Sequence, residues 1–134
     1  MTIDDQVREL GPEECWGLLE RHEFARLAYR LVDEVHIVPL NYVVDAGTLL
    51  IRTGSGNKLF AAALSSEVAL EIDWYDGFTA WSVVARGRLR RLEERERHRL
   101  DGHPRQPWLD TPKDDVVELV PSVVTGRRFR LSRT

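Results

Sequence analysis

The sequence predicts a small, mostly antiparallel β-barrel that carries two or three helices. Short runs rich in β-branched and aromatic residues recur along the chain, separated by turn-forming and charged segments. Residues 67–75 (EVALEIDWY) alternate between apolar and polar side chains, as a strand with one buried face does. Residues 45–47 (DAG) join two such runs by a turn so short that the strands form a direct antiparallel hairpin. These observations favour a barrel over a doubly wound sheet.

Composition limits the class of protein. The 134 residues fit a single domain spanning 1–134, and the 43% hydrophobic content is enough for a packed core. A net charge of −3 argues against a chain built as a whole to bind nucleic acid or an anionic membrane. The single cysteine, Cys15, excludes an intramolecular disulfide and suits a reducing cytoplasm. The N-terminus lacks the apolar segment of a signal peptide, and no apolar run approaches the roughly 20 residues that span a bilayer. We therefore expect a cytoplasmic protein with no nucleic-acid or membrane partner.

Two segments predict helices outside the strands. Residues 12–24 begin with Pro12, whose fixed φ suits the first helical position. Their apolar side chains fall on one helical face, which consists of Cys15, Leu18, Leu19 and His22. Residues 93–107 (EERERHRLDGHPRQP) are highly charged and predict a short exposed helix followed by a loop.

The strands are predicted from their β-branched content and alternation. In the first half they are residues 25–31, 35–45 and 48–53. Pro39 lacks the N–H that a strand pairs with, so it marks an edge, a bulge or a ligand contact. In the second half they are 67–75, 78–92 and 115–131, of which the last forms one strand or two. The expected buried faces are Val68, Leu70, Ile72 and Trp74 in the first of these, and Trp81, Val83, Ala85, Gly87 and Leu89 in the second.

The segment IRTGSGNK (Ile51–Lys58) is the strongest candidate for a binding site. It matches neither a P-loop, because Asn57 and Leu59 flank Lys58, nor a dinucleotide-binding glycine fingerprint. The amides of its glycine turn and a helix beginning near Gly56 nevertheless suit an anion. Arg52 and Lys58 add two positive charges that suit a phosphate. The alternative is a strand end, a glycine turn and two solvated cations, and spacing alone favours this alternative.

Six segments, in their order and spacing, resemble the pyridoxamine 5′-phosphate oxidase-like family of flavin-binding split barrels, in particular its short single-domain actinobacterial members. The resemblance covers the chain from about residue 10 to its end. The segments are ECWGLLE, RLAY, HIVPLNYVVDAGTLLIRTGSGNKL, VALEIDWYD, WSVVARG and PSVVTGRRF. The resemblance implies a six-stranded antiparallel split β-barrel. It also implies a homodimer that binds FMN in two equivalent clefts at the subunit interface.

The resemblance implies a role for each matching position. The isoalloxazine ring would lie along His36–Asn41. Its polar edge would contact backbone groups of Val38, Pro39 and Leu40 and the side chain of Asn41. The ribityl and phosphate oxygens would be held by Arg52, Thr53, Asn57 and Lys58. Trp81 and Ser82 match a segment that the second subunit contributes. Arg127 matches, more loosely, a basic position near the cofactor.

The sequence also departs from the family pattern. Alanine stands where glycine is frequent at Ala25 and Ala80, and VDEV (Val32–Val35) replaces a short turn that often contains Asp-Gly and a proline. The longer substrate-binding C-terminal region of true pyridoxamine phosphate oxidases is missing, so we do not expect that activity.

Three functional hypotheses follow from the resemblance. The first is an FMN-dependent oxidoreductase that passes electrons from a reduced nicotinamide to a small acceptor, with the cofactor carrying the chemistry. The second is a non-catalytic flavin store, sensor or partner-binding dimer. The third keeps the fold but binds deazaflavin F420 or haem. No side chain stands out as a required acid or base, and the spacing of the four histidines and one cysteine predicts no metal site.

Overall fold

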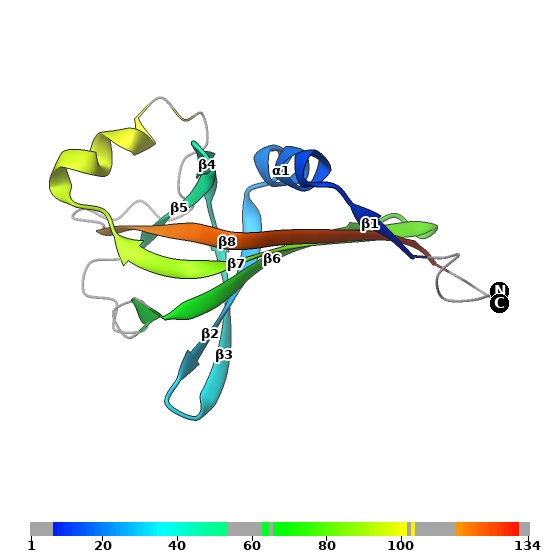
Figure 1. Cartoon of the computed structure of the whole chain (residues 1–134), viewed down its shortest axis with the longest axis horizontal. Coiled ribbons are helices and arrows are strands. Elements are labelled where there is room, and N and C mark those ends of the chain that lie inside the picture. The colour runs from blue at the N-terminus through cyan, green and yellow to red at the C-terminus, as the bar shows by residue number, and fades with distance from the viewer. Residues whose placement is uncertain (1–6, 54–62, 65, 102, 104–114, 132–134) are drawn as a thin grey trace.

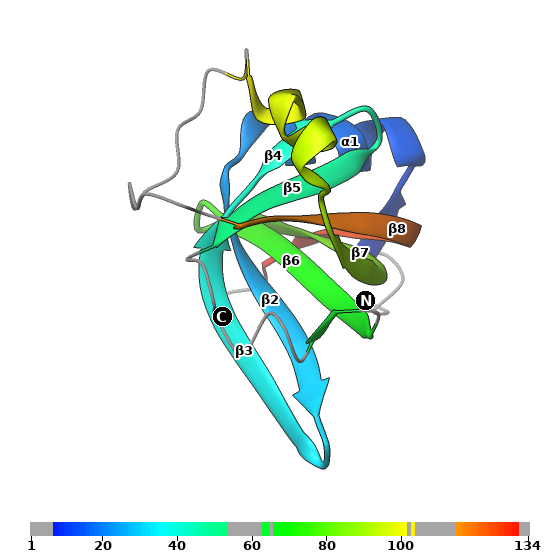
Figure 2. The ribbon, with the colours of Figure 1, turned by 90° about the vertical axis from the view of Figure 1, so that its left-hand side faces the viewer.

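The computed structural model describes residues 7–53, 63–64, 66–101, 103 and 115–131. Strands dominate this part of the chain, and the figures show them as one strongly curled sheet with helical segments against it (Figures 1 and 2). In chain order the elements are β1 (Val7–Leu10), α1 (Pro12–Arg21), β2 (Phe24–Leu31), β3 (Glu34–Asn41), β4 (Val43–Asp45), β5 (Thr48–Thr53), β6 (Glu67–Tyr75), β7 (Thr79–Arg91), the 3₁₀ helix η2 (Glu94–Leu100) and β8 (Asp115–Arg130).

All strand pairs between these elements are antiparallel, which confirms the predicted class. The sheet order is β3-β2-β6-β7-β8-β5-β4, and β1 adds to β8. Because β3 continues directly into β4 along the chain, the two ends of this order meet and the sheet closes into a split barrel. Figure 2 shows the hairpin of β2 and β3 extending well beyond the rest of the sheet.

The expected number of six strands is wrong, since the described sheet has eight. β1 is short and polar, and it exists because it pairs with β8 over Val7–Leu10. The predicted strand 35–45 breaks at Tyr42, so that β3 pairs with β2 whereas β4 pairs with β5. Tyr42 is 1% exposed, and its N–H and hydroxyl donate to the carbonyls of Glu23 and Leu19. These bonds fix the point at which the chain crosses from one sheet edge to the other.

Local signals predicted the turns and the edge correctly. Ala46 and Gly47 both have positive φ (48° and 80°), as a two-residue type I′ hairpin turn requires, so the DAG turn and the hairpin of β4 with β5 are confirmed. Pro39 lies on β3, an edge strand of the described sheet, which confirms the first of its three interpretations. The first helix begins at Pro12 as expected but ends at Arg21 rather than at residue 24.

The barrel core contains most of the predicted apolar positions. Cys15, Leu18 and Leu19 of α1 are buried in it, as is the expected face of β7. Trp74 is the exception, because it is 61% exposed. β2 pairs with β6 only as far as Glu71. The last residues of β6, including Trp74, therefore pair with β7 but extend past the pairing with β2. Among the helices of the described ranges, none is long and apolar enough to cross a bilayer.

The charged connector, residues 93–107, is less solvated over its described residues 93–101 and 103 than the sequence suggests. Its helix is confirmed as η2, but Leu92 just before it is buried in a cluster with Val43, Leu50 and Val116, and Leu100 packs against this cluster. Arg99 of η2 reaches Glu118 of β8, and Arg90 of β7 reaches the same carboxylate, both at 2.6 Å. Glu118 is only 3% exposed, and its ion pair with Arg99 holds η2 against the barrel.

The longest strand of the sheet, β8, contains a bulge. Arg86 pairs with Val123 and Gly87 pairs with Pro121, which leaves Ser122 as an extra residue whose hydroxyl donates to the carbonyl of Arg86 at 3.2 Å. A Cβ at Gly87 would lie on the carbonyl oxygen of Val120 and 2.8 Å from the Cα of Pro121. The backbones of β7 and β8 can approach this closely only because residue 87 has no side chain.

Gly87→Ala is therefore expected to destabilise the fold. Overpacking against backbone typically costs about 1–3 kcal/mol, and here the neighbouring atoms cannot rotate away. The measurement is the free energy of unfolding in urea, with Gly11→Ala as the matched control, since a Cβ at Gly11 meets nothing within 4 Å. Equal stability of the two variants would contradict the close-contact explanation.

Candidate functional site

The strand expected to lie along a flavin ring is an open edge of the sheet. Val38 and Leu40 of β3 pack against the core, while Pro39 between them is exposed. On its inner side β3 pairs with β2, for example Pro39 with Arg26. β3 is the last strand in the described order, so its other side pairs with no strand of the described sheet and its backbone groups there are available in principle to a ligand. Asn41 ends the strand next to Tyr42, where the barrel closes.

Arg52 and Thr53 lie on the strand that faces this edge. They are the last two residues of β5, and β5 contacts β3 where the barrel closes. Thr53 is buried, and Arg52 is half-buried beside Val116 of β8. The structure therefore brings β3 and the end of β5 together. The other two expected phosphate ligands, Asn57 and Lys58, lie outside the described residues.

Ser82 and Arg127 form a separate group in the structure. They pair directly across β7 and β8. Thr53 pairs with Asp115, which precedes Arg127 by twelve residues on β8. At about 3.3 Å per residue that separation is roughly 40 Å along the strand. One chain therefore does not place Ser82 and Arg127 beside Arg52 and Thr53.

Trp81 points to the opposite side of β7 from Ser82, because side chains alternate along a strand. It is 8% exposed, and its ring lies 5.0 Å from that of His22 in a tilted arrangement. Its indole is thus mostly part of the core beside α1, with an edge on the surface depression described next.

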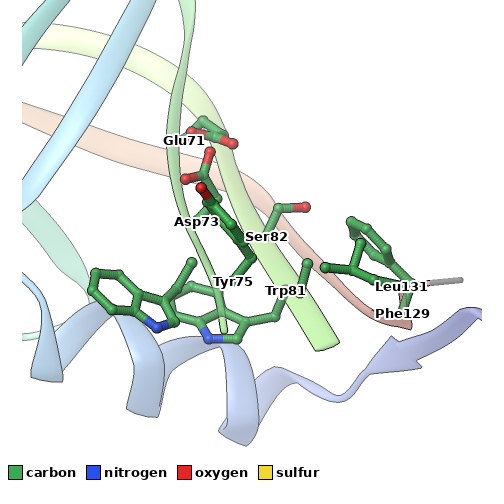
Figure 3. A pocket seen from close by; sticks show the side chains of 9 residues that line it. Glu71, Asp73, Tyr75, Trp81, Ser82, Phe129 and Leu131 are labelled. Atoms are coloured by element: carbon green, nitrogen blue, oxygen red, sulfur yellow. The ribbon is translucent and has the colours of Figure 1, made fainter. Parts of the chain in front are cut away.

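A depression of about 660 Å³ lies where β6 and β8 end and β7 begins, and we call it the aromatic depression (Figure 3). Two carboxylates and several aromatic rings dominate its lining. The described residues that line it are Glu71, Asp73, Trp74, Tyr75, Ala80, Trp81, Ser82, Phe129 and Leu131.

A second depression of about 510 Å³ adjoins it at Ser82, and we call it the arginine depression because Arg86 and Arg127 line it. It lies between β1, β7 and β8, and the other described lining residues are Glu9, Leu10, Pro12, Val84, Val124, Thr125 and Gly126.

An ion-pair triad at the rim of the aromatic depression escaped sequence reasoning. The Nη1 atom of Arg26 lies 2.9 Å from a carboxylate oxygen of Glu71 and 2.9 Å from a carboxylate oxygen of Asp73. The alternation of β6 already places both carboxylates on its polar face. Their partner lies on β2, 45 and 47 residues away in the sequence, so only the strand pairing could reveal it.

The triad gives Glu71 an unusual proton affinity. Partial burial, the hydrogen bond with Asp73 and the charge of Asp73 raise the pKa of Glu71 from 4.5 to about 7, although Arg26 acts in the opposite direction. Glu71 therefore changes charge close to neutral pH. A carboxyl with such a pKa can hold or release a proton at the working pH of an enzyme.

His36, at the start of the range expected to lie along the flavin ring, is partly exposed. Its ring stacks on Tyr29 across β2 and β3 with 5.3 Å between centroids, and its Nε2 lies 3.2 Å from a carboxylate oxygen of Glu34. These contacts describe a packed surface residue of the hairpin.

Comparison with known proteins settles the family. A family model described as pyridoxamine 5′-phosphate oxidase matches residues 11–128. The chain belongs to this family. An uncharacterised member from Mycobacterium tuberculosis is 31% identical over 131 residues, which are 92% of this chain and 86% of that protein.

Solved structures place the fold in the same family. The FAD binding protein from Mycobacterium smegmatis is 36% identical and superposes with a TM-score of 0.85, covering 93% of this chain and 100% of its own. A conserved protein of unknown function from Corynebacterium diphtheriae is 31% identical, with a TM-score of 0.79 and coverages of 93% and 99%. The pyridoxamine 5′-phosphate oxidase-like split barrel predicted from the sequence is therefore confirmed, apart from its strand count.

Glu71 is expected to make stability fall between pH 4.5 and about 7. Its pKa is higher in the folded chain than the ordinary 4.5 of an unfolded chain. Between these values the folded chain binds more protons, so the stabilisation is complete below pH 4.5 and is lost as the pH rises through about 7. Urea unfolding at several pH values should show this slope in the parent protein. It should be absent in Glu71→Gln and retained in Glu67→Gln, the control on the same strand. A Glu71→Gln profile with the parent's slope would contradict the assignment.

Proposed function

We propose that this protein is a cytoplasmic flavin-nucleotide-binding redox protein. The observation that carries the proposal is the meeting of an open edge strand, β3, with the cationic end of β5. β3 supplies backbone groups and Asn41 for a polar ring edge, and Arg52 and Thr53 supply donors for phosphate and ribityl oxygens. The FAD-binding name of the similar Mycobacterium smegmatis protein supports a flavin. FMN and FAD share the ribityl phosphate that these donors would hold.

The flavin supplies the redox chemistry when it is bound, accepting a hydride and passing on electrons. This chain's residues would then bind and orient it. The proposed set of phosphate donors also includes Asn57 and Lys58, which follow β5 in the sequence. Our preferred activity is electron transfer from a reduced nicotinamide to a small acceptor, without true pyridoxamine phosphate oxidase activity.

A second copy of the chain would complete the site. Ser82 and Arg127 lie roughly 40 Å along β8 from the β5 end, so a cleft that uses both groups needs β7 and β8 of another subunit. The outer face of the sheet offers a surface for such a contact that is apolar over β3, β2 and β6. Ile37 is 65% exposed there, and its row continues across the neighbouring strands through Ala28, Ala69, Arg86 and Val123, of which only Arg86 on β7 is charged. We propose a homodimer with the cofactor clefts at this interface.

The absorption spectrum of freshly purified protein tests the cofactor proposal. Oxidised flavin, F420 and haem have distinct bands, and chromatography of the released cofactor separates FMN from FAD. A flavin spectrum with rapid oxidation of a reduced nicotinamide supports the oxidoreductase. Flavin without nicotinamide turnover supports the non-catalytic store or sensor. A haem or F420 spectrum, or no bound chromophore after incubation with FMN and FAD, would overturn the flavin proposal.

Removing a phosphate-binding cation should weaken FMN selectively. A charge-assisted hydrogen bond contributes roughly 1.5–3 kcal/mol, so Arg52→Ala and Lys58→Ala should each weaken FMN about tenfold to a hundredfold. Riboflavin, which lacks the phosphate, should bind almost as it does to the parent. Flavin fluorescence titrations measure both ligands, with Arg95→Ala on the exposed surface of η2 as the control. Equal losses for FMN and riboflavin would show that these residues do not act on the phosphate.

A charge on the proposed dimer face should separate the subunits. Ile37→Lys places an ammonium group in a contact that would otherwise bury an apolar side chain, and desolvating that charge is unfavourable. Sedimentation at micromolar concentration should show a dimer for the parent, a monomer for Ile37→Lys and a dimer for the control Glu94→Lys on η2. Flavin affinity should fall with the dimer. A monomeric parent that retains flavin would refute both the assembly and the shared cleft.

A further inference from the structure

A buried network of charged side chains lies beside the end of β5 that carries Arg52. At its centre is Glu118 of β8, which is 3% exposed. The Glu118 carboxylate accepts hydrogen bonds from three donors, which are Arg99 of η2 at 2.6 Å, Arg90 of β7 at 2.6 Å and Thr48 of β5 at 2.7 Å. The network therefore joins η2, β5, β7 and β8 at one carboxylate.

Arg99 extends this network to the neighbouring strand β4. Its Nε donates to a carboxylate oxygen of Asp45 on β4 at 2.8 Å, and its Nη2 donates to the hydroxyl of Thr48 at 3.1 Å. Asp45 and Thr48 are partners across the β4–β5 hairpin, and the Nε2 atom of His103 lies 3.2 Å from Asp45. One guanidinium group thus ties both strands of the hairpin to η2 and to β8.

Arg52 shares the face of β5 that η2 covers. Side chains alternate along a strand, so Leu50 and Arg52 point to one side and Thr53 points to the other. Leu50 belongs to the cluster beneath η2, so the covered side is also that of Arg52. On β8 the cross-strand neighbours of Leu50 and Arg52 are Glu118 and Val116. Arg52 therefore lies one row away from Glu118 on the same face of the sheet.

We propose that Arg99 is a positioning residue for the phosphate-binding end of β5, acting through Glu118 and Thr48 on Arg52. This inference rests on the proposed function, in which Arg52 holds the flavin phosphate. The tie to η2 and β8 fixes the strand that carries Arg52 before the cofactor binds. Without the tie, ordering this strand end becomes part of the binding step and lowers the affinity. Arg99 itself does not touch the cofactor.

Arg99→Met tests the tie, with Arg95→Met as the matched control. Arg95 lies on the same helix with 82% of its side chain exposed, and its ion pair with Glu93 stays within the connector. The ion pair of Arg90 with Glu96 still holds η2 in both variants. In flavin fluorescence titrations of the full-length protein, Arg99→Met should weaken FMN about fivefold. Its riboflavin affinity, and both affinities of Arg95→Met, should equal those of the parent.

A double-variant cycle separates positioning from a general loss of structure. Because Arg99 acts through Arg52, Arg99→Met should weaken FMN no further in a protein that already carries Arg52→Ala. Additive losses in the double variant, or equal losses for FMN and riboflavin in Arg99→Met, would overturn the proposal. Thr48→Val removes the hydroxyl between Arg99 and Glu118 at similar side-chain size. It should weaken FMN in the same selective way, so the test does not depend on the folding of Arg99→Met.

Amide hydrogen exchange of the purified full-length protein gives a readout that needs no added flavin. Residues 51–53 should exchange faster in Arg99→Met than in the parent and in Arg95→Met, because this strand end opens more easily without the tie. Unchanged exchange there would contradict the proposal. If Arg52→Ala leaves the preference for FMN over riboflavin intact, the proposed phosphate role fails and the positioning role falls with it. If Arg52→Ala removes that preference but Arg99→Met keeps it, only the positioning role fails.

Discussion

The close approach of β7 and β8 at Gly87 is the constraint on which the rest of the structure depends. Without a side chain at this position, the carbonyl of Val120 and the ring of Pro121 can pack directly on the neighbouring backbone. The bulge at Ser122 absorbs one extra residue of β8. Before the bulge β8 pairs with β5, and after it β8 pairs with β1. One strand can therefore serve both halves of the split barrel because its pairing with β7 continues past the bulge.

Side chains on both faces of β5 are buried, and this burial holds the end of β5, where the phosphate is proposed to bind, in place. Leu49 and Ile51 face the barrel core, whereas Leu50 faces the smaller cluster beneath η2. Glu118 lies at this second cluster and receives hydrogen bonds from Arg99, Arg90 and Thr48. Burial raises the pKa of Glu118, but these hydrogen bonds outweigh it and leave its pKa below the ordinary range, so the carboxylate stays charged. The charged connector is thus a structural cover for β5.

The same long strand separates the two groups of residues that the family resemblance would join in one cleft. Arg52 and Thr53 lie beside one end of β8, and Ser82 and Arg127 lie near the other. A single barrel consequently holds the two halves of the proposed cleft apart, one at the cationic end of β5 and one beside aromatic and acidic side chains. A paired assembly would reunite them, and the depressions that meet at Ser82 would then border the shared cleft. The acidic triad and the arginine depression give this border opposite charges on its two sides.

The sequence by itself determined the class of the fold and most of its elements, because the period of two in β6 and β7, the DAG turn and Pro12 are local signals. It also pointed to the candidate site at the end of β5, through the residue types of Arg52 and Thr53. Only the tertiary structure decided the break at Tyr42, the strand β1, the exposure of Trp74 and the burial of Glu118. Each of these depends on partners far away in the sequence, such as Leu19 for Tyr42 and Arg99 for Glu118. The triad of Arg26, Glu71 and Asp73 arises in the same way, since strand pairing alone brings a cation of β2 to two carboxylates of β6.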